Sequence, residues 1–160
     1  MSNVRRLQML HNEELYALAS EFFRVFSRTE YALKASGFNR GDGPAEANWA
    51  TFALAVEAFI ANPGATEVSE AVEFIFREPP KKQFIDNGEI QWRDIKPSTN
   101  SRADELFQYI RRIRNNLFHG GKFNGRWFAP ERSESLMKAG LIVLLASVEA
   151  EARVREAYRG

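Results

Sequence analysis

Apolar side chains recur every three or four residues over most of the sequence, the spacing that places them on one face of an α-helix. The first such segment follows Asn12, a favourable N-cap residue, and ends at Gly37, a residue that commonly terminates helices. Its apolar positions are Leu15, Leu18, Phe22, Val25, Phe26 and Leu33. The pattern predicts a long first helix between Asn12 and Gly37.

Four further segments show the same spacing, and each is bounded by residues that favour helix ends. They run from Gly43-Pro44 to Asn62-Pro63-Gly64, from Thr66 to Pro79-Pro80, from Ser101 to Gly120-Gly121, and from about Ser133 to Tyr158. In the fourth segment, Ser101 and Asp104 resemble a capping box. The apolar stripe of this segment is Leu106, Ile110, Ile113 and Leu117.

Two short segments depart from the helical pattern. Residues 84–92 alternate around Asn87-Gly88, and residues 122–127 carry a second Asn-Gly pair, which is a strong signal for a two-residue hairpin turn. We therefore expect an all-α fold, a single helical bundle of about five helices with one or two short β-hairpins. A length of 160 residues fits one domain spanning residues 1–160.

Composition narrows the possible chemistry. The chain has no cysteine, which excludes disulfides, thiol catalysis and cysteine-ligated metal. Its formal net charge is only +1, so a nucleic-acid contact must come from a local basic patch. The longest apolar run, residues 139–148, is too short to span a bilayer, and residues 1–10 do not form a signal peptide. We expect a cytoplasmic protein with no membrane contact, no metal and no cofactor.

The segment from Arg111 to Gly121 holds the candidate chemistry, because it places one of only two histidines at the predicted end of the fourth helix. Three arginines and two asparagines precede His119. Histidine titrates near neutral pH and can move protons, and arginine holds a phosphate through a fixed fork of donors. These residue types are the ones that acid–base chemistry on a phosphodiester requires.

Helical spacing predicts which of these side chains share a face. Residues four apart are neighbours on a helix, so Arg111, Asn115 and His119 form one row, which Arg114 borders. The apolar stripe points elsewhere, which leaves the row at the rim of the core. Residue types alone permit a second interpretation, in which basic residues in the last turn before Gly-Gly simply terminate a helix.

The string Arg114-Asn115-Asn116-Leu117-Phe118-His119 resembles the Arg-polar-x-x-x-His signature of the HEPN superfamily. HEPN domains are all-α, and their motif lies near the end of a late helix. The longer string from Arg114 to Lys122 resembles the subgroup found as compact bacterial defence or toxin-like proteins. The first-helix string from Phe22 to Lys34 is also similar to such domains.

The resemblance implies a metal-independent endoribonuclease, acting as a toxin or as an antiviral or stress effector. It implies that His119 is the acid–base residue, Arg114 the phosphate ligand and Asn115 the orienting residue. RNA supplies its own nucleophile, the ribose 2′-hydroxyl, so the expected products carry a 2′,3′-cyclic phosphate. Further candidates are Arg111 and Lys122 as substrate-binding residues, and Glu30 as a carboxylate that holds Arg114.

The expected partners are RNA, with tRNA among the candidates, and a second copy of the chain. Cleavage requires a base and an acid, but only His11 and His119 are present, and His11 precedes the predicted first helix. A homodimer with a composite site would bring two copies of His119 together. A separate antitoxin or regulator is a further expected partner. Two alternatives remain open: a non-catalytic HEPN-type module that binds RNA or nucleotides, and a helical interaction protein.

Overall fold

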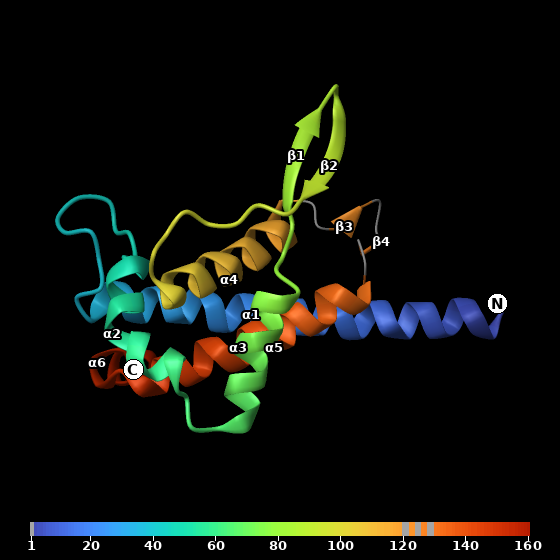
Figure 1. The fold of residues 1–160 in the computed structure, drawn as a ribbon. Helices are drawn as coiled ribbons and strands as arrows, with labels where there is room; N and C mark the ends of the chain where they lie inside the picture. Colours follow the sequence, from blue (N-terminus) through green and yellow to red (C-terminus); the bar gives the residue numbers. More distant parts are fainter. Residues whose placement is uncertain (1, 120–121, 124–125, 128–129) are drawn as a thin grey trace.

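The computed structural model describes residues 2–119, 122–123, 126–127 and 130–160, and these residues form a helical bundle with two small β-ribbons (Figure 1). The described helices and strands are α1 (Asn3–Ala35), α2 (Trp49–Ala61), α3 (Thr66–Arg77), β1 (Lys82–Asp86), β2 (Glu89–Arg93), α4 (Arg102–Phe118), β3 (Lys122–Phe123), β4 (Arg126–Trp127), α5 (Pro130–Ala150) and α6 (Ala152–Arg159). The predicted all-α fold with short hairpins is confirmed. Among the described helices, none is long and apolar enough to cross a membrane.

Helix α1 starts earlier than the sequence pattern indicated. It begins at Asn3, where the Ser2 hydroxyl accepts a hydrogen bond from the Arg5 backbone N–H at 3.4 Å, so the prediction that Asn12 caps it is wrong. Residues 3–11 contain neither proline nor glycine and are mostly good helix formers, which lets the helix continue through Asn12. The predicted end is confirmed, since Ser36 caps the helix and Gly37 follows at φ +94°.

Two other boundaries differ from the prediction. Helix α2 begins at Trp49 rather than at Gly43-Pro44, because the Asn48 side chain accepts a hydrogen bond from the Thr51 N–H at 3.2 Å. The last predicted helix is two helices, α5 and α6. They are separated at Glu151, whose carboxylate accepts a hydrogen bond from the Val154 N–H at 3.0 Å and so caps α6.

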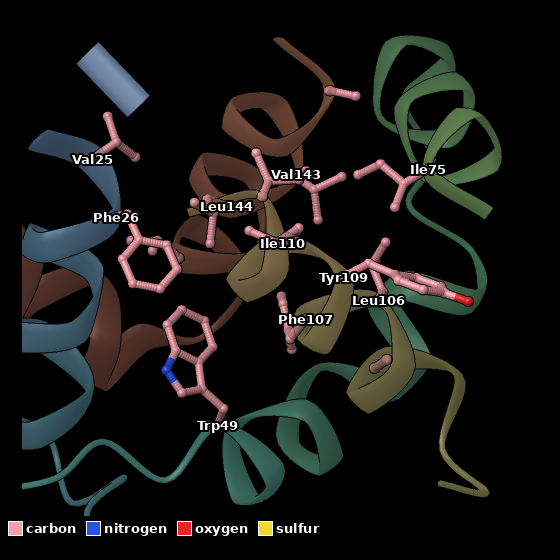
Figure 2. Packing of buried hydrophobic residues seen from close by; sticks show 14 of the residues in the cluster. Val25, Phe26, Trp49, Ile75, Leu106, Phe107, Tyr109, Ile110, Val143 and Leu144 are labelled. Atoms are coloured by element: carbon pink, nitrogen blue, oxygen red, sulfur yellow. The ribbon is translucent and has the colours of Figure 1, made fainter. Parts of the chain in front are cut away.

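Aromatic side chains fix α4 in the bundle. Phe107 is fully buried and stacks on Phe52 of α2, with ring centroids 5.2 Å apart, while Trp49 lies 5.6 Å from Phe107 (Figure 2). Ile110 reaches the core beside Leu144 of α5 (Figure 2). The predicted apolar stripe of α4 is buried as far as Ile113, and Leu117 is half-buried. Because this face points inward, the polar face that carries the motif points outward.

The β1–β2 ribbon stands beside the C-terminal half of α4 (Figure 1). It turns at Asn87 and Gly88, whose φ values of +50° and +79° both lie in the left-handed region that a type I′ hairpin turn requires. At its root, the Asn116 side chain of α4 donates a hydrogen bond to the Lys81 carbonyl at 2.8 Å. The ribbon is therefore anchored to the helix that carries the motif.

Candidate functional site

The last turn of α4 presents His119 to solvent. His119 caps the helix with φ −102° and ψ 34°, and its backbone N–H donates to the Asn115 carbonyl at 2.8 Å. The imidazole is exposed. Gly120 and Gly121, predicted to end this helix, lie outside the described residues. The C-cap position leaves the imidazole free to meet a ligand.

A hollow of about 370 Å³ lies between the C-terminal half of α4 and the start of β1. The described residues that line it are three cationic side chains, four amides and one imidazole, with no carboxylate among them: Lys82, Arg111, Arg112, Gln83, Gln108, Asn115, Asn116 and His119. Cations and amide N–H groups are donors to anions, and arginine in particular matches the geometry of phosphate. The lining therefore favours an anionic, phosphate-bearing ligand.

The row expected from helical spacing is present. Arg111, Asn115 and His119 all line this hollow, as their separation by four residues predicts. Arg111 is exposed, and it has no carboxylate partner within the described part of the chain. Its guanidinium is thus available to a ligand that enters the hollow.

Arg114 occupies a different position from these three residues. Its guanidinium carbon lies 5.4 Å from the ring centroid of Phe26 on α1, and its Nη1 donates to Asn115 Oδ1 at 2.7 Å. Arg114 is not among the residues that line the hollow, whereas its partner Asn115 is. The structure therefore connects Arg114 to the hollow through the side chain of Asn115.

Glu30 does not hold Arg114. Its carboxylate accepts a hydrogen bond from the Trp49 indole N–H at 3.1 Å, which joins α1 to the start of α2. Arg114 packs on Phe26 instead, one turn of α1 before Glu30. The prediction that Glu30 orients Arg114 therefore has no supporting contact among the described residues, and the carboxylate has a structural partner.

Lys122 and His11 are the two remaining histidine or lysine residues considered from the sequence. Lys122 belongs to β3, but its side chain lies outside the part of the structure that is described. His11 lies on α1 and is half-buried, close enough to Glu134 of α5 to contribute slightly to lowering the pKa of that carboxyl, which the Lys138 hydrogen bond lowers most. The described hollow therefore has His119 as its one histidine.

Three residues that line the hollow, Lys82 and Gln83 of β1 and Gln108 of α4, were not predicted from the sequence. The basic pair Lys81-Lys82 after Pro79-Pro80 was a usable signal for the first of these. However, its meaning depends on a tertiary contact, the hydrogen bond from Asn116 to the Lys81 carbonyl, which no local pattern shows. Strand β1 is therefore part of the candidate site only through its anchor to α4.

Arg112 strengthens the same anchor. Its Nη1 donates to the carbonyls of Pro80 at 3.1 Å and Ile95 at 2.7 Å, on the two chain segments that enter and leave the ribbon. Burial lowers the pKa of this guanidinium, and nearby Tyr109 opposes the shift. Arginine stays charged well above neutral pH, so Arg112 adds a partly desolvated positive charge to the floor of the hollow.

An aromatic pair lies next to the imidazole. Phe118 stacks on Phe23 of α1 with ring centroids 6.2 Å apart, and it meets the His119 ring edge to face at 5.0 Å. Both phenylalanines are exposed, Phe118 by 65% and Phe23 by 44%. This pair gives the polar hollow an apolar border on the side of His119.

The chain matches no family model, no curated protein and no solved structure. Among the described residues, no group of three or more potential ligands, counting histidine, cysteine, aspartate and glutamate, could hold a metal ion. The functional interpretation therefore depends on the chemistry of the hollow and on the motif residues.

Proposed function

We propose that the chain is a metal-independent endoribonuclease that holds a phosphodiester in the hollow beside His119. The observation that supports this proposal most directly is the lining of the hollow: among the described residues, three cations and four amides surround one imidazole, and none is a carboxylate. Such a lining attracts an anion and offers one group that can exchange a proton near neutral pH. RNA fits this chemistry because its own 2′-hydroxyl is the nucleophile.

In the proposed reaction, the 2′-hydroxyl oxygen attacks phosphorus and the bond from phosphorus to the 5′-oxygen breaks. The 2′-hydroxyl loses its proton to a base, and an acid protonates the departing 5′-oxygen, so the products are a 2′,3′-cyclic phosphate and a 5′-hydroxyl. His119 supplies one of these proton transfers, worth roughly a hundred- to ten-thousand-fold in rate. Each well-placed donor to the phosphorane oxygens contributes roughly a hundred- to a thousand-fold more.

The geometry favours Arg111 and Lys82 as phosphate ligands, because both line the hollow. Arg114, which the HEPN resemblance would assign to the phosphate, is proposed here as a positioning residue. Its 2.7 Å hydrogen bond fixes the carboxamide oxygen of Asn115, so that the amide N–H₂ is directed away from Arg114. The N–H₂ group of Asn115 then serves as an oriented donor at the wall of the hollow.

The biological setting belongs to the same proposal. The substrate would be a cellular RNA such as tRNA, in the cytoplasm, and the protein would be a toxin or an effector of defence or stress controlled by a separate antitoxin or regulator. A homodimer is also part of the proposal. The reaction needs both a base and an acid, but the described hollow contains one histidine. In a composite site, His119 of the second copy would be the other proton carrier.

One observation favours a second candidate, a module that binds RNA or nucleotides without cleavage. Within the described hollow, His119 is the one imidazole, and the guanidinium of Arg114 lies over Phe26. Such an arrangement would still bind phosphate through Arg111 and Lys82 but would lack the second proton carrier. This candidate predicts RNA affinity that survives the loss of His119.

The decisive experiment incubates total RNA and purified tRNA with the protein in excess EDTA. Wild type is compared with His119→Ala and Arg111→Ala, and His11→Ala serves as the control histidine variant. We expect fragments ending in cyclic phosphate with wild type and His11→Ala only, and no cleavage of an all-deoxy substrate. Equal binding by wild type and His119→Ala without cleavage by either would support the binding module.

A further inference from the structure

Two phenylalanines beside the candidate site leave much of their rings in solvent. Phe118, in the last turn of α4, is 65% exposed, and Phe23 of α1 is 44% exposed. Their rings stack with centroids 6.2 Å apart and an angle of 14° between the ring planes. We call these two side chains the aromatic pair. A single exposed apolar side chain is common on a protein surface, whereas two stacked rings next to a polar hollow offer a flat surface that a ligand can cover.

The aromatic pair lies next to both ends of the motif. The imidazole of His119 meets the ring of Phe118 with centroids 5.0 Å apart and 80° between the planes. Arg114 precedes Phe118 by four residues on α4, so the two side chains are neighbours on one face of the helix. The guanidinium of Arg114 lies 5.4 Å from the ring centroid of Phe26, three residues after Phe23 on α1. The contacts of Arg114 and of Phe118 with α1 are therefore successive, one helical turn apart.

His119 borders two surfaces of different chemistry. It lines the hollow together with cations and amides, and it also contacts Phe118. Neither phenylalanine of the aromatic pair is among the described residues that line the hollow, so the cationic surface and the flat apolar surface meet at the imidazole. A nucleotide has the same division, because its ribose joins a charged phosphate to a flat aromatic base. A phosphate in the hollow therefore leaves the base to be placed on the aromatic pair, with the ribose beside His119.

The size and surroundings of the aromatic pair favour a base over a protein partner. Rings exposed to this extent offer together roughly 200 Å² of apolar surface, whereas a stable protein interface buries about 800 Å² on each side. Exposed polar side chains lie at neighbouring helical positions: Ser20 and Ser27 beside Phe23, and Asn115 beside Phe118. A surface of two rings with polar neighbours matches the face of one nucleobase, whose edges carry hydrogen-bonding groups.

We propose that the aromatic pair is a stacking platform for a nucleobase of the RNA whose phosphate binds in the hollow. The identity of the ligand rests on the proposed function, and the platform adds the surface on which the base lies. The base stacks on the exposed surface of Phe118, which Phe23 holds in place. Every base has such a face, so the platform contributes affinity with little sequence preference. A base inside a duplex is already stacked on its neighbours, so the platform favours an unpaired nucleotide.

Binding of a short 2′-O-methyl oligonucleotide tests the platform without cleavage, because this RNA analogue has no free 2′-hydroxyl. Fluorescence anisotropy compares it with an abasic oligonucleotide of the same length, which keeps the sugar–phosphate backbone but has no bases. We expect Phe118→Ala to raise the dissociation constant of the base-bearing oligonucleotide about tenfold, the effect of losing one stacked base. The dissociation constant of the abasic oligonucleotide should not change. A duplex of the same sequence should bind to wild type and to Phe118→Ala equally.

Further variants separate stacking from a general loss of apolar surface. Phe118→Trp should bind the base-bearing oligonucleotide at least as tightly as wild type does. Phe118→Leu keeps an apolar side chain without a ring and should behave as Phe118→Ala. Tyr31→Ala is the matched control, because Tyr31 is an aromatic residue of α1 that is 62% exposed and lies about 12 Å along the helix from Phe23. This control should leave both dissociation constants unchanged.

Equal loss of affinity for both oligonucleotides in Phe118→Ala, or a Phe118→Leu variant that binds as wild type does, would overturn the platform. A change of mass in sedimentation velocity on Phe118→Ala substitution would assign the aromatic pair to a protein interface instead.

The proposed function has separate readouts. If Arg111→Gln weakened the binding of both oligonucleotides and Phe118→Ala weakened neither, the hollow would bind phosphate and the platform would be wrong. If Phe118→Ala selectively weakened the base-bearing oligonucleotide while wild type left RNA uncleaved, the platform would stand and the ribonuclease would not. A wild type that binds neither oligonucleotide would overturn both.

Discussion

The side chain of Asn116 donates a 2.8 Å hydrogen bond to the backbone carbonyl of Lys81, and this contact joins the motif helix to the root of the β1–β2 ribbon. The neighbouring residue Asn115 differs, because its side chain accepts from Arg114 and does not reach the ribbon. Two adjacent asparagines on one helix therefore have separate tasks. Both side chains line the hollow, but Asn116 also holds the root of the ribbon that carries Lys82 and Gln83, whereas Asn115 binds Arg114.

Asn116→Ala should loosen the ribbon. The Lys81 carbonyl loses its donor, which we expect to lower the free energy of unfolding by about 1 kcal/mol and to accelerate hydrogen exchange of the amides in β1 and β2. Hydrogen exchange measured by mass spectrometry over residues 82–93 checks this. Asn115→Ala is the matched control and should leave exchange in the ribbon at the wild-type rate. Equal acceleration in both variants would show that the contact at Lys81 does not anchor the ribbon.

Arg111→Gln should weaken RNA binding in a salt-dependent manner. A lost phosphate contact lowers the slope of log K against log salt concentration by about 0.7 for a single strand. Fluorescence anisotropy with a labelled RNA oligonucleotide measures this slope. Arg24→Gln removes the same charge from an exposed position on α1, where Arg24 pairs with Glu21 at 2.7 Å, and serves as the control. If both variants gave the same slope, Arg111 would not be a phosphate ligand.

A feature of the fold or of the candidate site could be predicted from the sequence when the contacts that determine it are between residues close together in the chain. The helical spacing of Arg111, Asn115 and His119 correctly placed them on one face, because that relation needs only the geometry of one helix. The start of α1 was missed because Asn12 is a good cap in isolation, yet the residues before it are also helical. The sequence did not predict that Lys82 and Gln83 of β1 line the hollow. Their position depends on a hydrogen bond from the Asn116 side chain to a carbonyl 35 residues earlier, which no local pattern shows.

Gly140 of α5 lies directly against the ring of Phe22 on α1. A Cβ atom at this position would lie 2.8 Å from Cε2 of Phe22 and 3.7 Å from Cδ1 of Ile113. Gly140→Ala should therefore destabilise the fold, because an overpacking cost of about 1–3 kcal/mol outweighs the gain of about 1 kcal/mol in helix propensity. Urea denaturation of the variant measures the net loss.

A compensating substitution tests the cause of that loss. Phe22→Leu removes the ring atoms that the new methyl group meets, so the double variant Phe22→Leu/Gly140→Ala should lose less stability than the sum of the two single variants. Strict additivity would show that the clash with Phe22 is not the reason. A Gly140→Ala variant as stable as wild type would show that α5 shifts to accommodate the methyl group.

The stability of α6 depends on pH through the ionisation of Glu151. Burial raises the pKa of its carboxyl, but hydrogen bonds from the Val154 N–H and from the Arg153 guanidinium lower it, and the lowering prevails. The carboxylate is therefore favoured in the folded state. A lowered folded-state pKa stabilises the protein above the ordinary carboxyl pKa, and this contribution is lost as the pH falls from that value through the lowered one.

Glu151→Ala removes the cap of α6 and should lower the free energy of unfolding by about 1 kcal/mol at neutral pH. The difference from wild type should shrink on acidification, because protonation weakens the same cap in wild type. Urea denaturation at a series of pH values measures both effects. Glu156→Ala, an exposed glutamate of the same helix, is the control for the lost charge. If the difference in unfolding free energy between wild type and Glu151→Ala stayed constant down to the acid transition, the cap would not depend on the ionised carboxylate. The hydrogen bond to the Val154 N–H would then separate α5 from α6 whether or not the carboxyl is charged.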